Sequence, residues 1–305
     1  MPLSPYQIMK RILSCLVLAF TISLLPAADG ESKFKRTEDV LYGRKFGTAL
    51  TLDVFEPEKK NGAAVIFMVS GGFFSSHESI NGKTYSPFLN RGYTVFAVVH
   101  GSQPKFQIPE ITQDIHRAVR FVRVNASRWG VDPQKFGITG GSAGGHLSLT
   151  MGTQGGPGKA DAKDPVDRES SAVQAVACFF PPTDFLNWGS AGDDAVGVGT
   201  LKNFKPAFGS KSDTAEGRQE LGREISPLNF VTAKTAPTFI SHGDGDKLVP
   251  IYQAEIFEKK CKEAGVTFKL IVKPGAEHGW AGMEKEMAMF ADWFDEHLLS
   301  TKPKN

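Results

Sequence analysis

The chain has 305 residues, of which 41% are hydrophobic and 22% charged, and its formal net charge is +2. This length and this balance permit one large α/β domain that buries its own core without help from disulfide bonds. The near-neutral charge gives no electrostatic case for a nucleic-acid partner, and the sequence has no internal repeat, heptad run or long charge block.

The first 28 residues have the pattern of a secretory signal peptide. Lys10 and Arg11 precede an apolar run over residues 12–25, and small residues follow at 26–28. The run is shorter than the roughly 20 apolar residues that cross a bilayer, so an uncleaved anchor is the weaker alternative. We expect a secreted or periplasmic protein whose mature chain, residues 29–305, has no stable membrane span.

Apolar runs then predict the strands of a sheet. Residues 50–55 alternate apolar and polar side chains, which suits an antiparallel edge strand. The continuous apolar runs at 63–69 and 94–99 are typical of strands buried on both faces of a parallel sheet. Further strands are predicted at 135–139, 173–180, 238–241 and 266–272.

Helices are predicted between these strands. From Pro109 to Gly130 the apolar residues recur at helical spacing, and further helices are expected at 251–264 and 283–299. Alternating strands and helices indicate an α/β fold, a mostly parallel twisted sheet of about eight strands with helices on both faces. Residues 154–170 read as a surface loop, and residues 186–224 as a lid-like insertion within the same domain.

Two cysteines, Cys178 and Cys261, remain after the leader. Each lies in an apolar pattern, which favours buried free thiols over the alternative of one disulfide bond.

The main chemical signal is the sequence GGSAGGH at residues 140–146. It follows a strand and precedes an apolar helix, and small residues are needed where a serine sits on a sharp strand-to-helix turn. Ser142 is therefore the candidate nucleophile, and the amide of Ala143 a candidate oxyanion donor at a helix N-terminus. The pattern alone is weak in a glycine-rich chain, and a turn that only packs or binds phosphate is the alternative.

A second glycine-rich turn follows the strand at 63–69. Acyl transfer needs several N–H donors where the carbonyl oxygen becomes negative, and Gly71 and Gly72 allow close backbone approach. They are the other candidate oxyanion donors, against the alternative of an ordinary glycine turn.

The candidate acid and base lie in two later loops, 242–250 and 275–280, each after a predicted strand. Open α/β sheets bind ligands at these carboxyl ends. His278 is expected to take the proton of Ser142 and return it to the leaving alcohol. Asp246 is expected to orient the imidazole, and the order serine, acid, histidine suits this architecture.

Other polar residues compete for these roles. Asp244 is the main alternative acid and Asp184 a weaker one. Five further histidines are expected to be structural, surface or hydrogen-bonded residues: His100, His116, His146, His242 and His297. No group of potential ligands has metal-site spacing, so no catalytic metal is expected.

Four segments carry a family resemblance: GVDPQKFGITGGSAGGHLS, VACFFPPTDFLNW, SPLNFVTAKTAPTFISHGDGDKLVP and PGAEHGW. In this order they resemble carboxylesterases of the α/β-hydrolase superfamily, near the acetyl-esterase and feruloyl-esterase-like enzymes related to hormone-sensitive lipase. The resemblance covers about residues 38–300. It implies cofactor-free hydrolysis through an acyl-enzyme, with the catalytic and oxyanion residues named above.

One departure from the family affects the expected pocket. Relatives often read His-Gly-Gly-Gly where this chain reads Ser70-Gly71-Gly72-Phe73, so Phe73 is expected to narrow the acyl side. An aromatic substrate pocket is predicted, although each ring has a core alternative: Phe73, Phe74, Trp188 and Trp280.

The sequence thus predicts a serine carboxylic-ester hydrolase for short-chain or polysaccharide-linked esters of the acetyl or feruloyl type. Its partner would be a small-molecule or carbohydrate-linked ester. A serine peptidase of the prolyl-oligopeptidase-like type and a non-catalytic binding module of the same fold are the alternatives.

Overall fold

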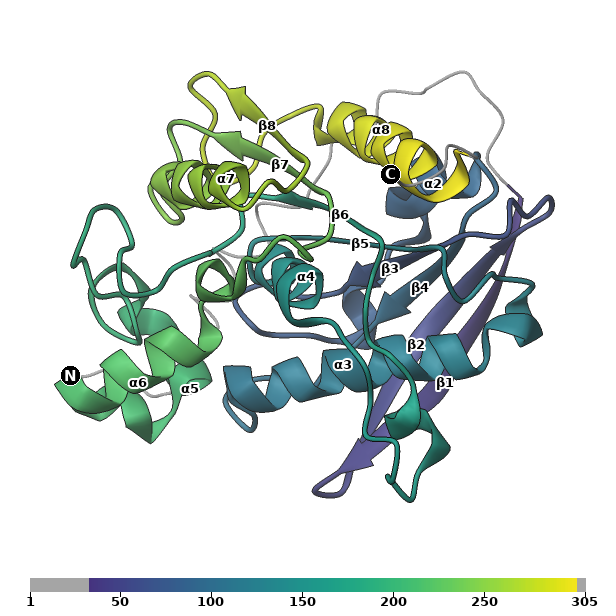
Figure 1. The fold of residues 1–305 in the computed structure, drawn as a ribbon, viewed down its shortest axis with the longest axis horizontal. Coiled ribbons are helices and arrows are strands. Elements are labelled where there is room, and N and C mark those ends of the chain that lie inside the picture. Colours follow the sequence, from purple (N-terminus) through teal and green to yellow (C-terminus); the bar gives the residue numbers. More distant parts are fainter. Residues whose placement is uncertain (1–32, 301–305) are drawn as a thin grey trace, which may run out of the picture.

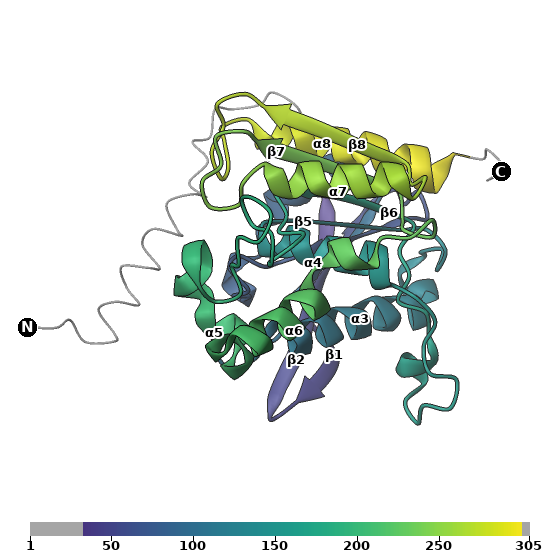
Figure 2. The ribbon, with the colours of Figure 1, turned by 60° about the vertical axis from the view of Figure 1, so that its left-hand side comes forward.

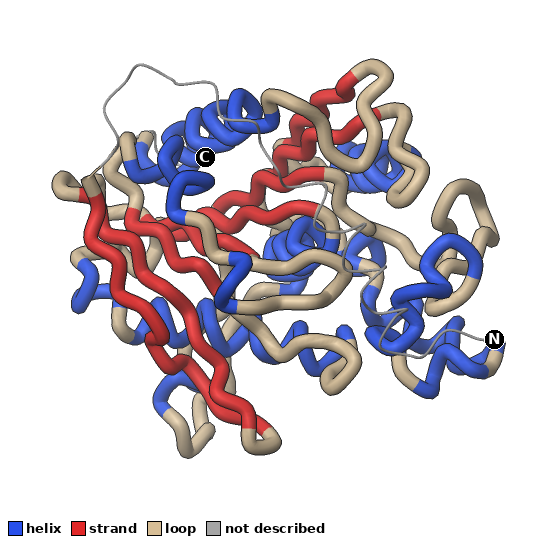
Figure 3. The backbone as a smooth tube through the Cα atoms, turned by 180° about the vertical axis from the view of Figure 1, so that it is seen from behind, coloured by secondary structure: helices blue, strands red, loops and turns tan. Residues whose placement is uncertain are grey.

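A computed structural model describes residues 33–300 of the protein, so the expected signal peptide lies outside the described residues. The described chain forms one eight-stranded sheet in the order β1-β2-β4-β3-β5-β6-β7-β8 (Figure 1). The pairs β1–β2 and β2–β4 are antiparallel and all the others are parallel. Seen from behind, the strands make one twisted band (Figure 3). The expected α/β-hydrolase sheet is confirmed.

The strand bounds follow the apolar runs closely, with one strand added. All the strands predicted from the sequence are present: β2 (Thr48–Pro57), β3 (Ala64–Met68), β4 (Thr94–Val98), β5 (Phe136–Gly141), β6 (Ala175–Phe179), β7 (Thr238–Gly243) and β8 (Phe268–Lys273). The added strand is β1 (Phe34–Lys45), which the sequence analysis missed. As an edge strand β1 has only two buried residues, so its side chains do not show the apolar pattern of a buried strand.

Helices cover both faces of the sheet. One face carries α3 (Ile108–Val124), α4 (Ala143–Gln154) and α7 (Tyr252–Glu263), and the other carries α2 (Ser86–Leu89) and α8 (Met283–Phe294). Figure 2 shows α7 on the near side of β7 and β8 and α8 on their far side. Each face buries its own hydrophobic cluster, so the sheet separates two hydrophobic cores.

The start and the buried face of α3 agree with the sequence. Pro109 lies in its first turn, and the five apolar residues at helical spacing are all fully buried: Ile111, Ile115, Ala118, Val119 and Val122. The helix ends at Val124 rather than at the expected Gly130, because a separate 3-10 turn, Ala126–Trp129, intervenes. Gly130 then ends that turn with the left-handed φ of 64° that glycine adopts readily.

The insertion at 186–224 is more regular than expected. It contains two helices, α5 (Lys205–Phe208) and α6 (Ala215–Ile225), and two 3-10 turns, Gly199–Phe204 and Ser210–Asp213. Thr214 caps α6 by accepting a hydrogen bond from the amide of Gly217, which stabilises the first turn. Figures 1 and 2 both place α5 and α6 beside the start of α3.

Both cysteines are buried free thiols, as expected. Burial raises the pKa of the Cys178 thiol, which keeps it protonated and unreactive. Within the part of the chain that the structure describes, no helix has the length and apolar character needed to cross a membrane.

Candidate active site

Ser142 lies on the sharp turn that joins β5 to α4. Its φ of 55° and ψ of −121° are unusual for a residue with a side chain, and such strain is typical of functional positions. A Cβ at Gly140 would lie 2.7 Å from the Gly144 carbonyl carbon, and a Cβ at Gly144 would lie 2.9 Å from the Met68 oxygen. The turn therefore requires glycine at both positions, as the sequence analysis expected.

Asp246 follows β7 and is buried, with its carboxylate fixed by the loop. Its Oδ1 accepts hydrogen bonds from the amides of Leu248 and Val249, each at 2.9 Å. Burial alone would raise the pKa of this carboxyl group. Hydrogen bonds from His242, His278 and the Val249 amide outweigh that effect and hold the pKa of Asp246 well below its usual range. The group is therefore ionised at neutral pH.

His278 follows β8 and connects the acid to the serine. Its Nδ1 lies 2.7 Å from Asp246 Oδ2, and its Nε2 lies 2.9 Å from Ser142 Oγ. Because an ionised carboxylate only accepts hydrogen bonds, Nδ1 carries the proton and the lone pair of Nε2 faces the serine. The structure thus brings together three side chains from the ends of three parallel strands, and 23% of the His278 side chain is exposed to solvent.

The alternative acids lie elsewhere. Asp244 accepts the amide of Gly275 at 2.6 Å, and Asp184 accepts the amide of Leu186 at 2.9 Å. His242 donates to the Val249 carbonyl from Nε2, which also lies 3.5 Å from Asp246 Oδ2. It contacts both the Val249 carbonyl and Asp246, as a structural loop residue does.

The turn that follows β3 is a two-residue hairpin. Gly71 and Phe74 exchange backbone hydrogen bonds at 3.0 and 2.9 Å, and the central residues Gly72 and Phe73 have φ values of 56° and 64°. Positive φ at both central positions is the type I′ turn. This corrects one expectation: the amide of Gly71 already donates to Phe74, so it is not available to a substrate.

The other two expected donors, Gly72 and Ala143, remain available, and Phe73 adds an amide that was not expected as a donor. No described residue accepts a hydrogen bond from the amide of Gly72 or from that of Phe73. Ala143 is the first residue of α4, where N–H groups have no acceptor inside the helix. The turn lies beside this helix end, since a Cβ at Gly144 would also be 3.3 Å from the Ser70 oxygen.

Comparison with known families adds to this geometry. The BD-FAE family model matches residues 52–261, a region that includes Ser142 and Asp246. The chain belongs to the BD-FAE family.

Individual relatives of this BD-FAE chain are esterases by name. It is 28% identical over 260 residues to esterase LipQ of Mycobacterium tuberculosis, and 26% identical over 247 residues to an acetylxylan esterase of Xylanibacter ruminicola. Each alignment covers 80% of this chain, but only 57% and 44% of the respective relatives.

Solved structures share its fold. A truncated carbohydrate esterase from gut microbiota superimposes with a TM-score of 0.76 at 26% identity, covering 90% of this chain and 99% of that one. The propionate-bound esterase Est2 of Thermogutta terrifontis has a TM-score of 0.65 at 23% identity, covering 90% and 97%.

The predicted aromatic pocket needs correction in the BD-FAE chain. Trp188 is 1% exposed and donates its indole N–H to the Leu248 carbonyl, so it belongs to the core. Phe73 is also buried, with its ring 5.4 Å from that of His146, and it does not narrow an open acyl site. Of the four rings, only Phe74, 43% exposed, and the half-buried Trp280 are accessible to solvent.

Two aromatic residues near the site were missed. Phe180 directly follows β6, and its ring centroid lies 4.4 Å from that of His278. Its place at the carboxyl end of the strand predicted at 173–180 is a signal that could have identified it. Phe204, in the insertion, lies against Gly72, since a Cβ there would be 2.6 Å from its ring. No local sequence pattern predicts this contact, because it joins segments far apart in the sequence.

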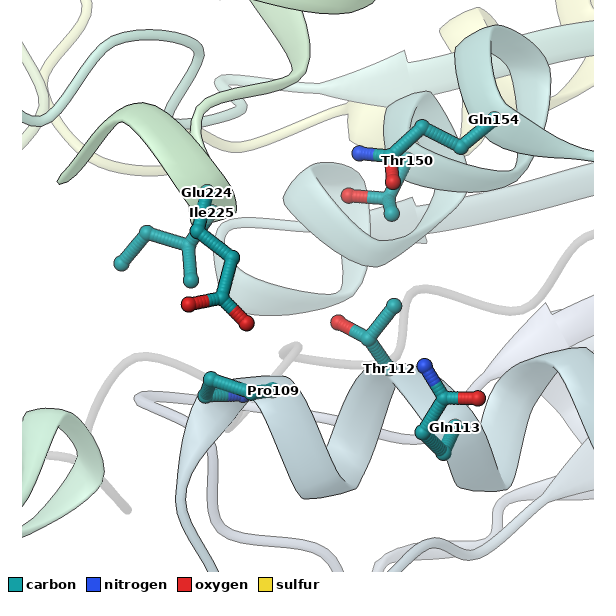
Figure 4. Close-up of a pocket in the computed structure, with 7 residues that line it drawn as sticks. All are labelled: Pro109, Thr112, Gln113, Thr150, Gln154, Glu224 and Ile225. Atoms are coloured by element: carbon teal, nitrogen blue, oxygen red, sulfur yellow. The ribbon is translucent and has the colours of Figure 1, made fainter. Parts of the chain in front are cut away.

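One small cavity is separate from this site. It has a volume of about 70 Å³ and lies between α3, α4 and the end of α6 (Figure 4). Its walls include Thr112, Thr150 and Glu224 but none of the three side chains at the Ser142 site. The cavity lies toward the far end of the helix that begins after Ser142.

Three side chains of the BD-FAE chain could together hold a metal ion. The ligand atoms of Asp39, Asp53 and His77 lie within 4.8 Å of one another. No spacing pattern in the sequence groups them, because they come from three different segments. In the structure Asp53 already accepts hydrogen bonds from Arg36, at 2.7 Å, and from the Asp39 amide, at 3.0 Å. The Asp53 carboxylate is therefore already satisfied by these contacts.

Proposed function

We propose that the protein hydrolyses carboxylic esters through an acyl-enzyme formed on Ser142. The observation that carries the proposal is the unbroken pair of hydrogen bonds, 2.7 and 2.9 Å long, that joins Asp246, His278 and Ser142. Serine is a weak nucleophile unless a base takes its proton, and this arrangement supplies the base together with the group that orients it.

In the first step Ser142 Oγ attacks the ester carbonyl carbon while His278 Nε2 takes its proton. Asp246 stabilises the positive charge that develops on the imidazole. His278 then gives the proton to the leaving alcohol, and the acyl group stays on the serine. In the second step His278 takes a proton from water as the water oxygen attacks the acyl carbon. The bond between that carbon and Ser142 Oγ then breaks, His278 returns the proton to Oγ, and the acid is released.

The negative charge on the carbonyl oxygen needs N–H donors. We assign this role to the amides of Ala143, Gly72 and Phe73, and remove Gly71 from it. The assignment rests on the absence of an acceptor for Gly72 and Phe73 among the described residues and on the orphan amide at the start of α4.

The proposed substrates are short-chain or polysaccharide-linked esters of the acetyl or feruloyl type. Phe204 covers the Gly72 side of the turn, which favours a small or flat acyl group. The exposed ring of Phe74 gives a flat surface for a sugar or aromatic alcohol. The names of the acetylxylan and carbohydrate esterases similar to this chain point in the same direction.

The test is turnover of p-nitrophenyl acetate by the wild type and by Ser142→Ala. The variant should lose on the order of 10⁶ in kcat, as measured for other serine hydrolases. Equal rates for the two proteins would end the proposal. Faster cleavage of an aminoacyl-proline anilide than of the ester would replace it with the peptidase alternative.

We also propose that residues 1–28 direct the chain to export. The support is the basic, apolar and small-residue order of that segment. N-terminal sequencing of the protein recovered from the periplasm or medium should begin near residue 29. An uncut protein in the membrane fraction would favour the anchor alternative.

A further inference from the structure

A buried glutamine holds the turn that carries two of the proposed oxyanion donors. Gln103 follows β4 and is 4% exposed. Its side-chain Nε2 donates to the Gly72 carbonyl at 2.5 Å, and its backbone amide donates to the Phe73 carbonyl at 3.2 Å. One residue therefore binds the carbonyl groups of both central residues of the hairpin turn.

The side-chain contact fixes the direction of the peptide group between Gly72 and Phe73, and the backbone contact holds the next carbonyl of the turn. In a trans peptide the carbonyl and the N–H point to opposite sides. Because the Gly72 carbonyl points at Gln103, the N–H of Phe73 points away from it. A rotation of this peptide group would remove the Gln103 contact and turn the Phe73 amide around.

The local sequence favours that rotation. A two-residue hairpin with glycine first and another residue second is typical of the type II′ turn, which needs a positive φ only at the glycine. The observed type I′ form also puts Phe73 at a φ of 64°, which is unfavourable for a bulky residue. Something outside the turn must stabilise the observed form, and the Gln103 side chain makes the contact with the Gly72 carbonyl that distinguishes it.

We propose that Gln103 is a positioning residue for ester hydrolysis, which selects the turn conformation in which the Phe73 amide serves as a donor. This inference rests on the proposed function. The Gln103 side chain itself contacts neither the three side chains at the Ser142 site nor the reacting atoms. Its hydrogen bond also polarises the Gly72–Phe73 peptide group, which strengthens the donor on the other side.

The main test is Gln103→Met, which keeps the size of the side chain and removes the donor. We expect kcat for p-nitrophenyl acetate to fall about tenfold to a hundredfold, less than for outright loss of one oxyanion donor, with KM changed by less than about threefold. Affinity for a trifluoromethyl ketone, whose adduct with the serine carries an oxyanion, should fall by a similar factor. The matched control is Gln174→Met. Gln174 accepts the Phe136 amide at the opposite end of the sheet, and its variant should leave both quantities unchanged.

A second variant separates positioning from folding. Gln103→Glu can donate to the Gly72 carbonyl only when its carboxyl is protonated. The ratio of wild-type to variant kcat should therefore shrink as the pH falls, which a purely structural defect does not produce. If Gln103→Met fails to fold, the pH dependence of this kcat ratio still tests the positioning role of Gln103.

The outcomes are distinguishable. If Ser142→Ala is as active as the wild type, the proposed function fails. If Ser142→Ala is inactive but a folded Gln103→Met keeps wild-type kcat and ketone affinity, only this inference is overturned. A kcat ratio for Gln103→Glu that does not depend on pH also overturns it.

Discussion

Among the described residues, two serine hydroxyls lie at nearly the same distance from the Nε2 atom of a histidine, while a third pair, Ser171 and His116, meets through Nδ1. Ser142 Oγ lies 2.9 Å from His278 Nε2, and Ser70 Oγ lies 2.8 Å from His100 Nε2. Each of these two histidines also has a partner at Nδ1, at 2.7 Å in both cases. For His278 the partner is the Asp246 carboxylate, and for His100 it is the carbonyl oxygen of Gly101.

The surroundings of the two imidazoles differ. His100 is 3% exposed, and burial, opposed by the Gly101 hydrogen bond and assisted by the charge of Lys45, lowers its pKa to about 4. A neutral carbonyl cannot balance an imidazolium charge, whereas the ionised Asp246 can. The hydrogen bond from a serine to a histidine is therefore not enough to make a nucleophile. The imidazole must also be able to accept the proton, and donors must face the reacting carbonyl.

The largest effect should come from making the Ser142 pair resemble the Ser70 pair. Asp246→Asn replaces the carboxylate by a neutral group and should lower kcat by about 10⁴, because the imidazole loses both its tautomer and its charge partner. The measurement is p-nitrophenyl acetate turnover with correctly folded protein.

Asp244→Asn is the matched control, since it changes the same residue type in the same loop. Its oxygen can still accept the Gly275 amide, and activity should stay within about threefold of the wild type. Full activity in Asp246→Asn, or a comparable loss in Asp244→Asn, would contradict the assignment of the acid.

The next effect tests the donors. Gly72→Ala places a methyl group 2.6 Å from the Phe204 ring at a φ of 56°, so the turn must shift. We expect kcat/KM to fall about tenfold to a hundredfold. The companion Gly71→Ala has open space and should change it by less than about threefold.

Combining Gly72→Ala with Phe204→Ala should recover part of the loss, because the second change removes the clash but not the backbone strain. If the Gly72 and Gly71 variants behave alike, the turn does not supply the donors in the way proposed here.

A smaller effect concerns stability. The pKa of His100 in the folded protein, about 4, lies below its ordinary value of 6.5. Between these values the unfolded chain binds a proton that the folded protein does not. The stability from neutral His100 is therefore complete above pH 6.5 and is lost as the pH falls toward 4.

His100→Asn should reduce the slope of unfolding free energy against pH in that window by up to about 1.4 kcal/mol per pH unit. Urea unfolding at several pH values measures it. His116 and His146 also have pKa values lowered to about 4 by burial, so part of the slope should remain. Equal slopes in the wild type and His100→Asn would show that the buried imidazole does not carry this effect.

The sequence was informative wherever local pattern decides the structure. Buried strands are continuous apolar runs, and loops that follow parallel strands gather at one edge. The three side chains at the Ser142 site could therefore be grouped from their order alone. The sequence was not informative where segments far apart along the chain meet. The conformation of the turn decides that Gly71 donates to Phe74. The packing of the insertion decides that Phe204 covers Gly72.

The same reason explains the errors about the aromatic residues. Phe73, Phe74, Trp188 and Trp280 lie in similar glycine-containing or polar stretches, and composition does not say which ring turns inward. Burial separates them only once the elements are packed, with Phe73 against His146 and Trp188 against Phe185.

Apart from the control variants, the smallest effect on catalysis should come from Ser70→Ala, and this variant is the sharpest test of the comparison. His100 donates from Nδ1 to a carbonyl, so its Nε2 has a lone pair that accepts the Ser70 hydroxyl proton. Removing the hydroxyl leaves a buried acceptor without a partner, which should cost about 1–3 kcal/mol of stability. Activity should fall by less than about tenfold, because only the start of the oxyanion turn is loosened.

If Ser70 were a second nucleophile, the double variant Ser142→Ala/Ser70→Ala would be less active than Ser142→Ala alone. We expect the single and the double variant to have the same residual rate, because an imidazole that resists protonation cannot take the proton of a serine, even at hydrogen-bond distance.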